Sequence, residues 1–151
     1  MKRLLKYGEP LLKAGRHVPF ACQKLAIEQL AQRLFAEPLA EGAFELLRGH
    51  WLRLQVTDLG LAWCVTCEGR RLKVAARGRA DVTIRGNWRE FLLLASRQED
   101  PDTLFFRRRL VIEGDTDLGL GVKNLLDALD PEHLPPMLWR MIRSMGQAVR
   151  V

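Results

Sequence analysis

The sequence contains few of the residues from which catalytic and disulfide-stabilised sites are usually built. Its 151 residues include three cysteines, three histidines and two serines, Ser96 and Ser144. An odd number of cysteines excludes a fully paired set of disulfides and indicates a reducing compartment. Both serines lie in predicted helices with no histidine nearby in sequence, so a serine nucleophile with an adjacent base is not favoured. We expect no enzymatic activity.

Long apolar runs are also missing from the sequence. No run approaches the roughly 20 residues that a membrane-spanning helix needs. The first residues do not resemble a cleavable signal peptide, and the last four match no organelle address. We therefore expect a cytoplasmic protein whose contact with membranes, where it occurs, is peripheral.

Positive charge is spread unevenly along the chain. The net charge is +6, yet residues 1–24 contribute +5 of it, from six basic residues and one acid, Glu9. The other 127 residues therefore carry only +1. Charge concentrated in an amino-terminal segment is typical of an arm that meets an anionic surface, whereas a nucleic-acid groove usually spreads its charge over the fold.

Residues 1–17 form an amphipathic basic segment. Wound as a helix, this segment places leucines on one face and basic side chains on the other. The predicted membrane contacts are Lys2, Arg3, Leu4, Leu5, Lys6, Leu11, Leu12 and Lys13. A helix of this kind either lies in a membrane interface or packs on its own domain. Gly8 and Pro10 weaken a continuous helix, and the sequence leaves both interpretations open.

From residue 18 on, the apolar pattern predicts one α+β domain over residues 18–151. Helical spacing over 21–36 predicts a core helix that Pro38 closes. Alternating patterns predict strands around residues 51–56, 61–67, 71–74, 80–84 and 110–112, with turns at Asp58 to Gly60 and at Glu68-Gly69. We expect a five-stranded, mostly antiparallel sheet, covered by helices on one side and enclosing a hydrophobic cavity.

Polar residues mark where the later helices begin. Asn87, Asp100 and Asp115 each precede an apolar helical pattern and are predicted caps, and Pro101 suits a first helical position. Pro131 ends the helix that follows Asp115. The last predicted helix begins near residue 134 and carries a soft apolar face, formed by Met137, Leu138, Met141, Ile142 and Met145.

The sequence gives weak support for a metal site or for a pair of catalytic carboxylates. Cys64 and Cys67, with Cys22 as a third ligand, are the only metal-like group. On a regular strand, side chains three positions apart point to opposite faces, so small buried residues are the favoured interpretation. Helix capping explains Asp115 with fewer assumptions than a catalytic pair with Glu113. We expect neither a metal nor a cofactor.

Basic clusters keep a nucleic-acid-binding module open as an alternative function. The clusters are Arg107 to Arg109 and a second group, Arg70, Arg71, Lys73, Arg77, Arg79 and Arg85. No aromatic residue interleaves with either group to stack on bases, and nearby acids offset the triplet. A solvated face is therefore favoured over a nucleic-acid site.

Two stretches of the sequence resemble known families. The order of elements over about residues 21–130 is similar to the sterol-carrier-protein type of lipid-binding domain, and RLVIEGD over 109–115 looks like its strand-to-helix signature. The longer stretch DPDTLFF, RRLVIEGDT, LGL and VKNL over 100–125 resembles the UbiT family of bacterial ubiquinone biosynthesis accessory factors. The chain departs from that family's pattern at Asp117 and Gly121.

The resemblance implies a non-catalytic factor of the oxygen-independent ubiquinone route that presents polyprenylated intermediates. The implied partners are a polyprenyl quinone or phospholipid ligand, the anionic surface of the inner membrane, and two hydroxylases that carry the iron–sulfur clusters. A general phospholipid or fatty-acid carrier remains an alternative. Each buried methylene is worth roughly 0.8 kcal/mol, so a polyprenyl tail must leave the bilayer inside a protein.

The predicted lipid contacts are apolar residues on the inward faces of the expected elements. They are Val65, Val74 and Ile84 from the sheet, and Phe91, Leu94, Phe105, Phe106, Leu118, Val122 and Met141 from the helices. Phe105 and Phe106 diverge by about 100° on a helix, so a compact core buries one and leaves the other for a cavity entrance.

Overall fold

The structure is a computed structural model that describes residues 18–76 and 78–149. The predicted membrane contacts between Lys2 and Lys13 lie outside these residues, as does the boundary at residue 17. Both stay predictions.

The described residues form an α+β fold. The strands are β1 (Leu52–Val56), β2 (Leu61–Glu68), β3 (Arg71–Ala75), β4 (Val82–Gly86) and β5 (Val111–Gly114). The α-helices are α2 (Phe20–Leu34), α3 (Ala36–Ala40), α4 (Trp88–Ala95), α5 (Pro101–Phe106), α6 (Thr116–Asp127) and α7 (Pro136–Val149). Two 3-10 helices, η2 (Ala43–Leu47) and η3 (Pro131–His133), complete the set.

The five strands form one mostly antiparallel sheet, as predicted. Their order is β3-β2-β1-β4-β5. Two hairpins join β1 to β2 and β2 to β3, and β4 pairs with β5, all antiparallel. Only the pairing of β4 with β1 is parallel, and the chain crosses from β3 at one edge past β2 and β1 to reach β4. The sheet is therefore mixed at one pairing.

The register of the sheet aligns apolar side chains in rows. Val65 pairs with both Val74 and Leu52, and Leu52 pairs with Val82. Side chains that face one another across strands lie on the same side of a sheet. Because alternate residues of a strand share a face, these rows give the sheet one apolar surface, which the helices cover.

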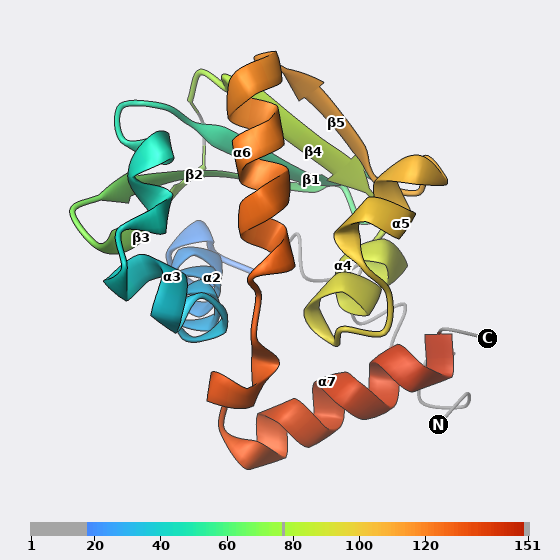
Figure 1. Cartoon of the computed structure of the whole chain (residues 1–151). Helices are drawn as coiled ribbons and strands as arrows, with labels where there is room; N and C mark the ends of the chain where they lie inside the picture. The colour runs from blue at the N-terminus through green and yellow to red at the C-terminus, as the bar shows by residue number, and fades with distance from the viewer. Residues whose placement is uncertain (1–17, 77, 150–151) are drawn as a thin grey trace.

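The helices lie on one side of the sheet, as Figure 1 shows. Helix α6 crosses the middle of the sheet, α2 and α3 lie toward β3, and α4 and α5 lie beneath the opposite end. Helix α7 lies farther from the strands and packs mainly on α4.

Two details of the predicted helices need correction. Pro38 does not close the first helix, because α2 already ends at Leu34. Pro38 is buried in the first turn of α3, where a backbone N–H has no partner within the helix, so proline costs no hydrogen bond there. Asn87 and Asp100 occupy cap positions, but neither side chain makes a capping hydrogen bond. The Trp88 N–H donates to Asp58 Oδ1 instead, at 3.1 Å.

The Gly114-Asp115 pair fixes the junction between β5 and α6. Gly114 has φ +114°, and a Cβ there would lie 2.2 Å from Asp81 O, so no larger residue fits. Asp115 accepts a hydrogen bond from the Leu118 N–H at 2.8 Å, as predicted for a cap. The family-like motif at this point therefore has a structural purpose.

Candidate functional site

The apolar layer between the sheet and the helices is the main candidate for a functional site. One continuous cluster of buried side chains joins inner positions of β1 to β4 to residues of α2, α3, η2, α4, α5 and α6, and Ile112 of β5 is partly buried against it. Several short helices and strands contribute side chains to this layer, and no single helix contributes most of them. Such a layer is chemically suited to an apolar ligand.

Eight of the ten predicted lipid contacts belong to this cluster. Five are buried within it, namely Val65, Val74, Ile84, Leu94 and Val122. Three are partly buried and pack against it, namely Phe91, Phe105 and Leu118. The structure thus brings together residues from strands and helices that lie up to 57 positions apart in the sequence.

The other two predicted contacts lie on the outside. Phe106 is 90% exposed and Met141 is 55% exposed. The exposure of Phe106 beside the partly buried Phe105 agrees with the expectation that a compact core buries only one of the pair. Met141 lies on α7, away from the apolar layer.

A hollow at the surface borders the Phe105–Phe106 pair. It has a volume of about 740 Å³, and its lining combines these two aromatics with Thr103, Asp102, Arg107 and Lys123 from α5, its end and α6. Lys123 Nζ and Asp102 Oδ1 form an ion pair at 2.7 Å across it. Phe105 lines this hollow and also packs against the apolar layer, so the hollow lies beside the margin of the layer.

Two further hollows are polar. One, of about 360 Å³, is lined by Thr57, Arg85, Gly86, Asn87, Glu90, Arg108, Arg109 and Val111. The other, of about 320 Å³, lies between α2 and the hairpin of β2 and β3. All three hollows open to solvent, so the predicted enclosed cavity stays a prediction.

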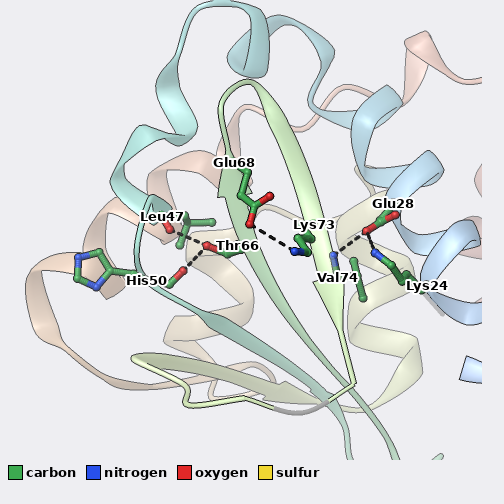
Figure 2. Close-up of polar contacts among 8 residues, drawn as sticks. All are labelled: Lys24, Glu28, Leu47, His50, Thr66, Glu68, Lys73 and Val74. Carbon is green, nitrogen blue, oxygen red and sulfur yellow. Dashed lines mark hydrogen bonds and ion pairs between the residues drawn. The ribbon is translucent and has the colours of Figure 1, made fainter. Parts of the chain in front are cut away.

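Polar side chains of α2 accept hydrogen bonds from backbone N–H groups on the free edge of β3. Figure 2 shows Glu28, whose Oε2 accepts a hydrogen bond from the Val74 N–H at 2.8 Å and also pairs with Lys24. Gln32 accepts more weakly from the Leu72 N–H at 3.4 Å. Desolvation alone would raise the pKa of Glu28, but hydrogen bonds from Lys24 and Val74 and the charges of Lys24 and Lys73 outweigh it and lower the pKa.

Sequence reasoning missed this edge contact. The signal was present in the sequence, since Glu28 and Gln32 stand four residues apart and therefore lie on the same side of the helix. An edge strand exposes unpaired N–H groups, and a helix that covers it needs acceptors at this spacing.

Thr66 holds the segment before β1 against the sheet. Its Oγ1 lies 2.9 Å from Leu47 O and 2.6 Å from His50 O (Figure 2), and its single proton serves these two acceptors. Thr66 is buried, so these contacts also satisfy a hydroxyl that would otherwise lie in the core without a hydrogen-bond partner.

The structure shows the environments of Cys64, Cys67 and Glu113, which the sequence suggested as candidates for metal binding or acid catalysis. Cys64 and Cys67 are buried and free, and burial together with the charge of Glu45 raises the pKa of the Cys67 thiol. Glu113 forms an ion pair with Arg85. Within residues 18–76 and 78–149, no group of histidines, cysteines and acids has the arrangement of a metal site.

Several arginines of the basic clusters are paired with acids. Arg109 pairs with two carboxylates, with its Nε 3.3 Å from Glu90 of α4 and its Nη1 3.0 Å from Glu99, which lies between α4 and α5. Arg85 pairs with Glu113, and Lys73 lies 3.4 Å from Glu68. These pairs reduce the positive charge that the two clusters offer to a polyanion.

No helix in the described part of the chain is both long and apolar enough to span a bilayer.

Comparisons with known proteins agree with the architecture. The chain is 40% identical over 148 residues, which are 97% of this chain and 85% of the relative, to the ubiquinone biosynthesis accessory factor UbiT of Escherichia coli strain K12. Among solved structures, the fold is similar to the UbiJ-SCP2 ubiquinone synthesis protein, with a TM-score of 0.58, 24% identity, and coverage of 73% of this chain and 93% of that one.

A second solved structure shows the same fold inside a longer chain. The sec-alkylsulfatase Pisa1 from Pseudomonas sp. matches with a TM-score of 0.52 and 19% identity, over 77% of this chain and 17% of that one. At these identities the two structures are evidence for the fold alone. Residues 27–127 match the model of the SCP-2 sterol transfer family, and the chain belongs to that family.

Proposed function

We propose that this chain is a non-catalytic lipid-binding factor that binds ubiquinone or its polyprenylated precursors in oxygen-independent ubiquinone biosynthesis. Its partners in this proposal are a polyprenyl ligand, an anionic membrane surface, and two hydroxylases that carry the iron–sulfur clusters themselves. The name of the 40% identical relative supports the pathway.

One observation carries the lipid-binding part of the proposal. The apolar layer reaches the surface at Phe105, where a hollow of about 740 Å³ begins. In this proposal a prenyl tail enters beside Phe105 and reaches the apolar layer, against which Phe91 and Leu118 also pack. Moving the short helices apart to admit the tail would break few backbone hydrogen bonds, because each helix makes these bonds within itself.

The first experiment is mass spectrometry of an organic extract of the purified full chain from cells grown without oxygen. We expect a copurified polyprenyl quinone or precursor. Phospholipid or fatty acid alone in the extract would favour a general carrier. Ubiquinone levels in a strain lacking its own copy of the gene, grown with and without oxygen, test the oxygen-independent role.

Phe105→Asp tests the place of binding. A charge at the margin of the apolar layer should abolish copurification, because a buried carboxylate strongly opposes an apolar ligand. Leu25→Asp is the matched control, since Leu25 is 60% exposed on α2. If Phe105→Asp fails to fold, Phe105→Trp narrows the same place with an apolar side chain. Full lipid occupancy in a folded variant would remove this site from the proposal.

Nucleic-acid binding is the competing outcome. Anisotropy titrations with an unrelated DNA duplex should show weak binding, because Arg85 and Arg109 are already paired with acids. Tight binding that falls steeply with added salt would support the alternative instead.

A further inference from the structure

We propose that the outward face of α7, formed by Met137, Arg140 and Met141, is a docking surface for a membrane that carries anionic lipids. This inference builds on the proposed function, in which an anionic membrane is a partner, by naming the surface that meets the membrane. It is argued from the geometry of α7, whatever lipid the domain carries.

The outward face of α7 exposes large apolar side chains next to one another. Met137 is 77% exposed and Met141 is 55% exposed, and residues four positions apart lie on the same side of a helix. Leu138, 36% exposed, extends the patch along one flank. Single exposed apolar residues are ordinary, but adjacent ones on one helix face usually mark an interaction surface.

The fold itself uses the other side of α7. Trp139 and Ile142 are partly buried and pack against the apolar layer. Gly146 is buried, and a Cβ at that position would lie 2.1 Å from Ser96 Oγ, so α7 lies very close to the end of α4. This contact fixes the rotation of the helix, and it turns Met137 and Met141 outward.

Charge selects an anionic partner. Residues 134–149 contain Arg140 and Arg143 and no aspartate or glutamate, and both arginines are exposed. Arg140 lies about 60° around the helix from Met137 and about 100° from Met141, so it flanks the two methionines on one side. Apolar side chains flanked by arginines are typical of helices that lie in the plane of a membrane interface, where methionine adapts to irregular acyl chains.

Two other occupants fit this face less well. A second copy that packs face to face would bring the arginines of one α7 against those of the other. The chain's own segment 1–17 contains five basic residues and one acid, so it too would place like charges together. A surface of anionic phospholipid avoids both conflicts.

Cosedimentation of the full chain with vesicles tests the proposal. The probes are vesicles of phosphatidylcholine alone and of phosphatidylcholine with one part in three of phosphatidylglycerol. We expect the double variant Met137→Ser/Met141→Ser to lose about tenfold in affinity for the mixed vesicles. Arg140→Gln/Arg143→Gln should lose about tenfold on mixed vesicles and nothing on neutral ones, because each basic residue contributes through anionic lipid.

The control is Leu25→Ser/Leu120→Ser, which removes two leucines that are 60% and 59% exposed on α2 and α6. It should bind like the unaltered chain. All these positions are exposed, so melting temperatures should stay the same. Binding by Met137→Ser/Met141→Ser within about twofold of the unaltered chain would overturn the proposal. A change from dimer to monomer in light scattering would assign the face to a second copy and overturn it as well.

Discussion

Helices α6 and α7 have similar sequence patterns and very different surroundings. Both repeat apolar residues at helical spacing, and they follow one another along the chain. In α6, Gly119, Val122 and Leu125 are buried and Leu120 is the one strongly exposed leucine. In α7, Gly146 is the one buried residue, while Met137, Leu138 and Met141 face solvent.

The difference shows that an apolar helix face is buried in one part of this fold and left partly exposed in another. Helix α6 lies across the centre of the sheet, so its apolar face completes the core (Figure 1). Helix α7 follows after η3 has already closed the core with Leu134, which is 4% exposed. Part of its apolar surface, formed by Met137, Leu138 and Met141, therefore stays exposed.

The comparison predicts its largest effect for charges placed in the two helices. Val122→Asp in α6 should lower the free energy of unfolding by more than about 3 kcal/mol, because Val122 is 2% exposed and an isolated buried charge is very costly. Met141→Asp in α7 should change it by less than about 0.5 kcal/mol. Urea unfolding followed by circular dichroism measures both, and equal losses would break the comparison.

A smaller effect is expected at the joint between α7 and α4. Gly146→Ala should destabilise by about 1 to 3 kcal/mol, because the new Cβ overlaps Ser96 and overpacking strains a tight contact. Hydrogen exchange should become faster in α7 and stay unchanged in α6. Adding Ser96→Gly should restore part of the loss, and simple additivity of the two changes would contradict a direct contact.

Helix α2 extends the comparison to a helix held by polar contacts. The pKa of Glu28 is below its ordinary value of 4.5, so the stability it contributes is present above pH 4.5 and is lost as the pH falls through the lowered pKa. We expect a contribution of at most about 1 kcal/mol, since the Glu28 side chain is 23% exposed. Exchange at the Val74 amide between pH 3 and 6 measures it, and Glu28→Gln should flatten the pH dependence.

The smallest effect compares exposed residues of the two helices. Leu120→Ser in α6 and Met137→Ser in α7 should each change the free energy of unfolding by less than about 0.5 kcal/mol. Thermal unfolding measures this. A loss above about 1 kcal/mol for Met137→Ser would show that Met137 contributes to the core, contrary to its 77% exposure.

Much of the fold was predictable from the sequence because its signals are local. The alternation of Leu52, Leu54 and Val56 predicted β1, and the turns at Gly60 and Gly69 predicted the two hairpins, because hairpins join strands that are neighbours in sequence. The cap at Asp115 follows from one side chain and the backbone three residues later.

The parallel pairing of β4 with β1 was not predictable in the same way. Leu54 and Ile84 are partners across 30 residues, and nothing in either strand's pattern distinguishes this neighbour from another. The candidate site likewise combines features that the sequence predicts with contacts that it does not predict. Inward faces identified Val65, Val74 and Val122 as residues of one layer, but the order of strands decided that they meet.

The sequence by itself determined the periods, turns and caps, and with them five strands, their hairpins and the helices, because those features depend on residues a few positions apart. Only the tertiary structure decided which apolar helix face is buried. Met141 and Val122 look alike as apolar positions on amphipathic helices, yet Met141 faces solvent because Gly146 meets Ser96 from another helix and sets the rotation of α7. Burial is a property of the whole packing arrangement, so no local pattern contains it.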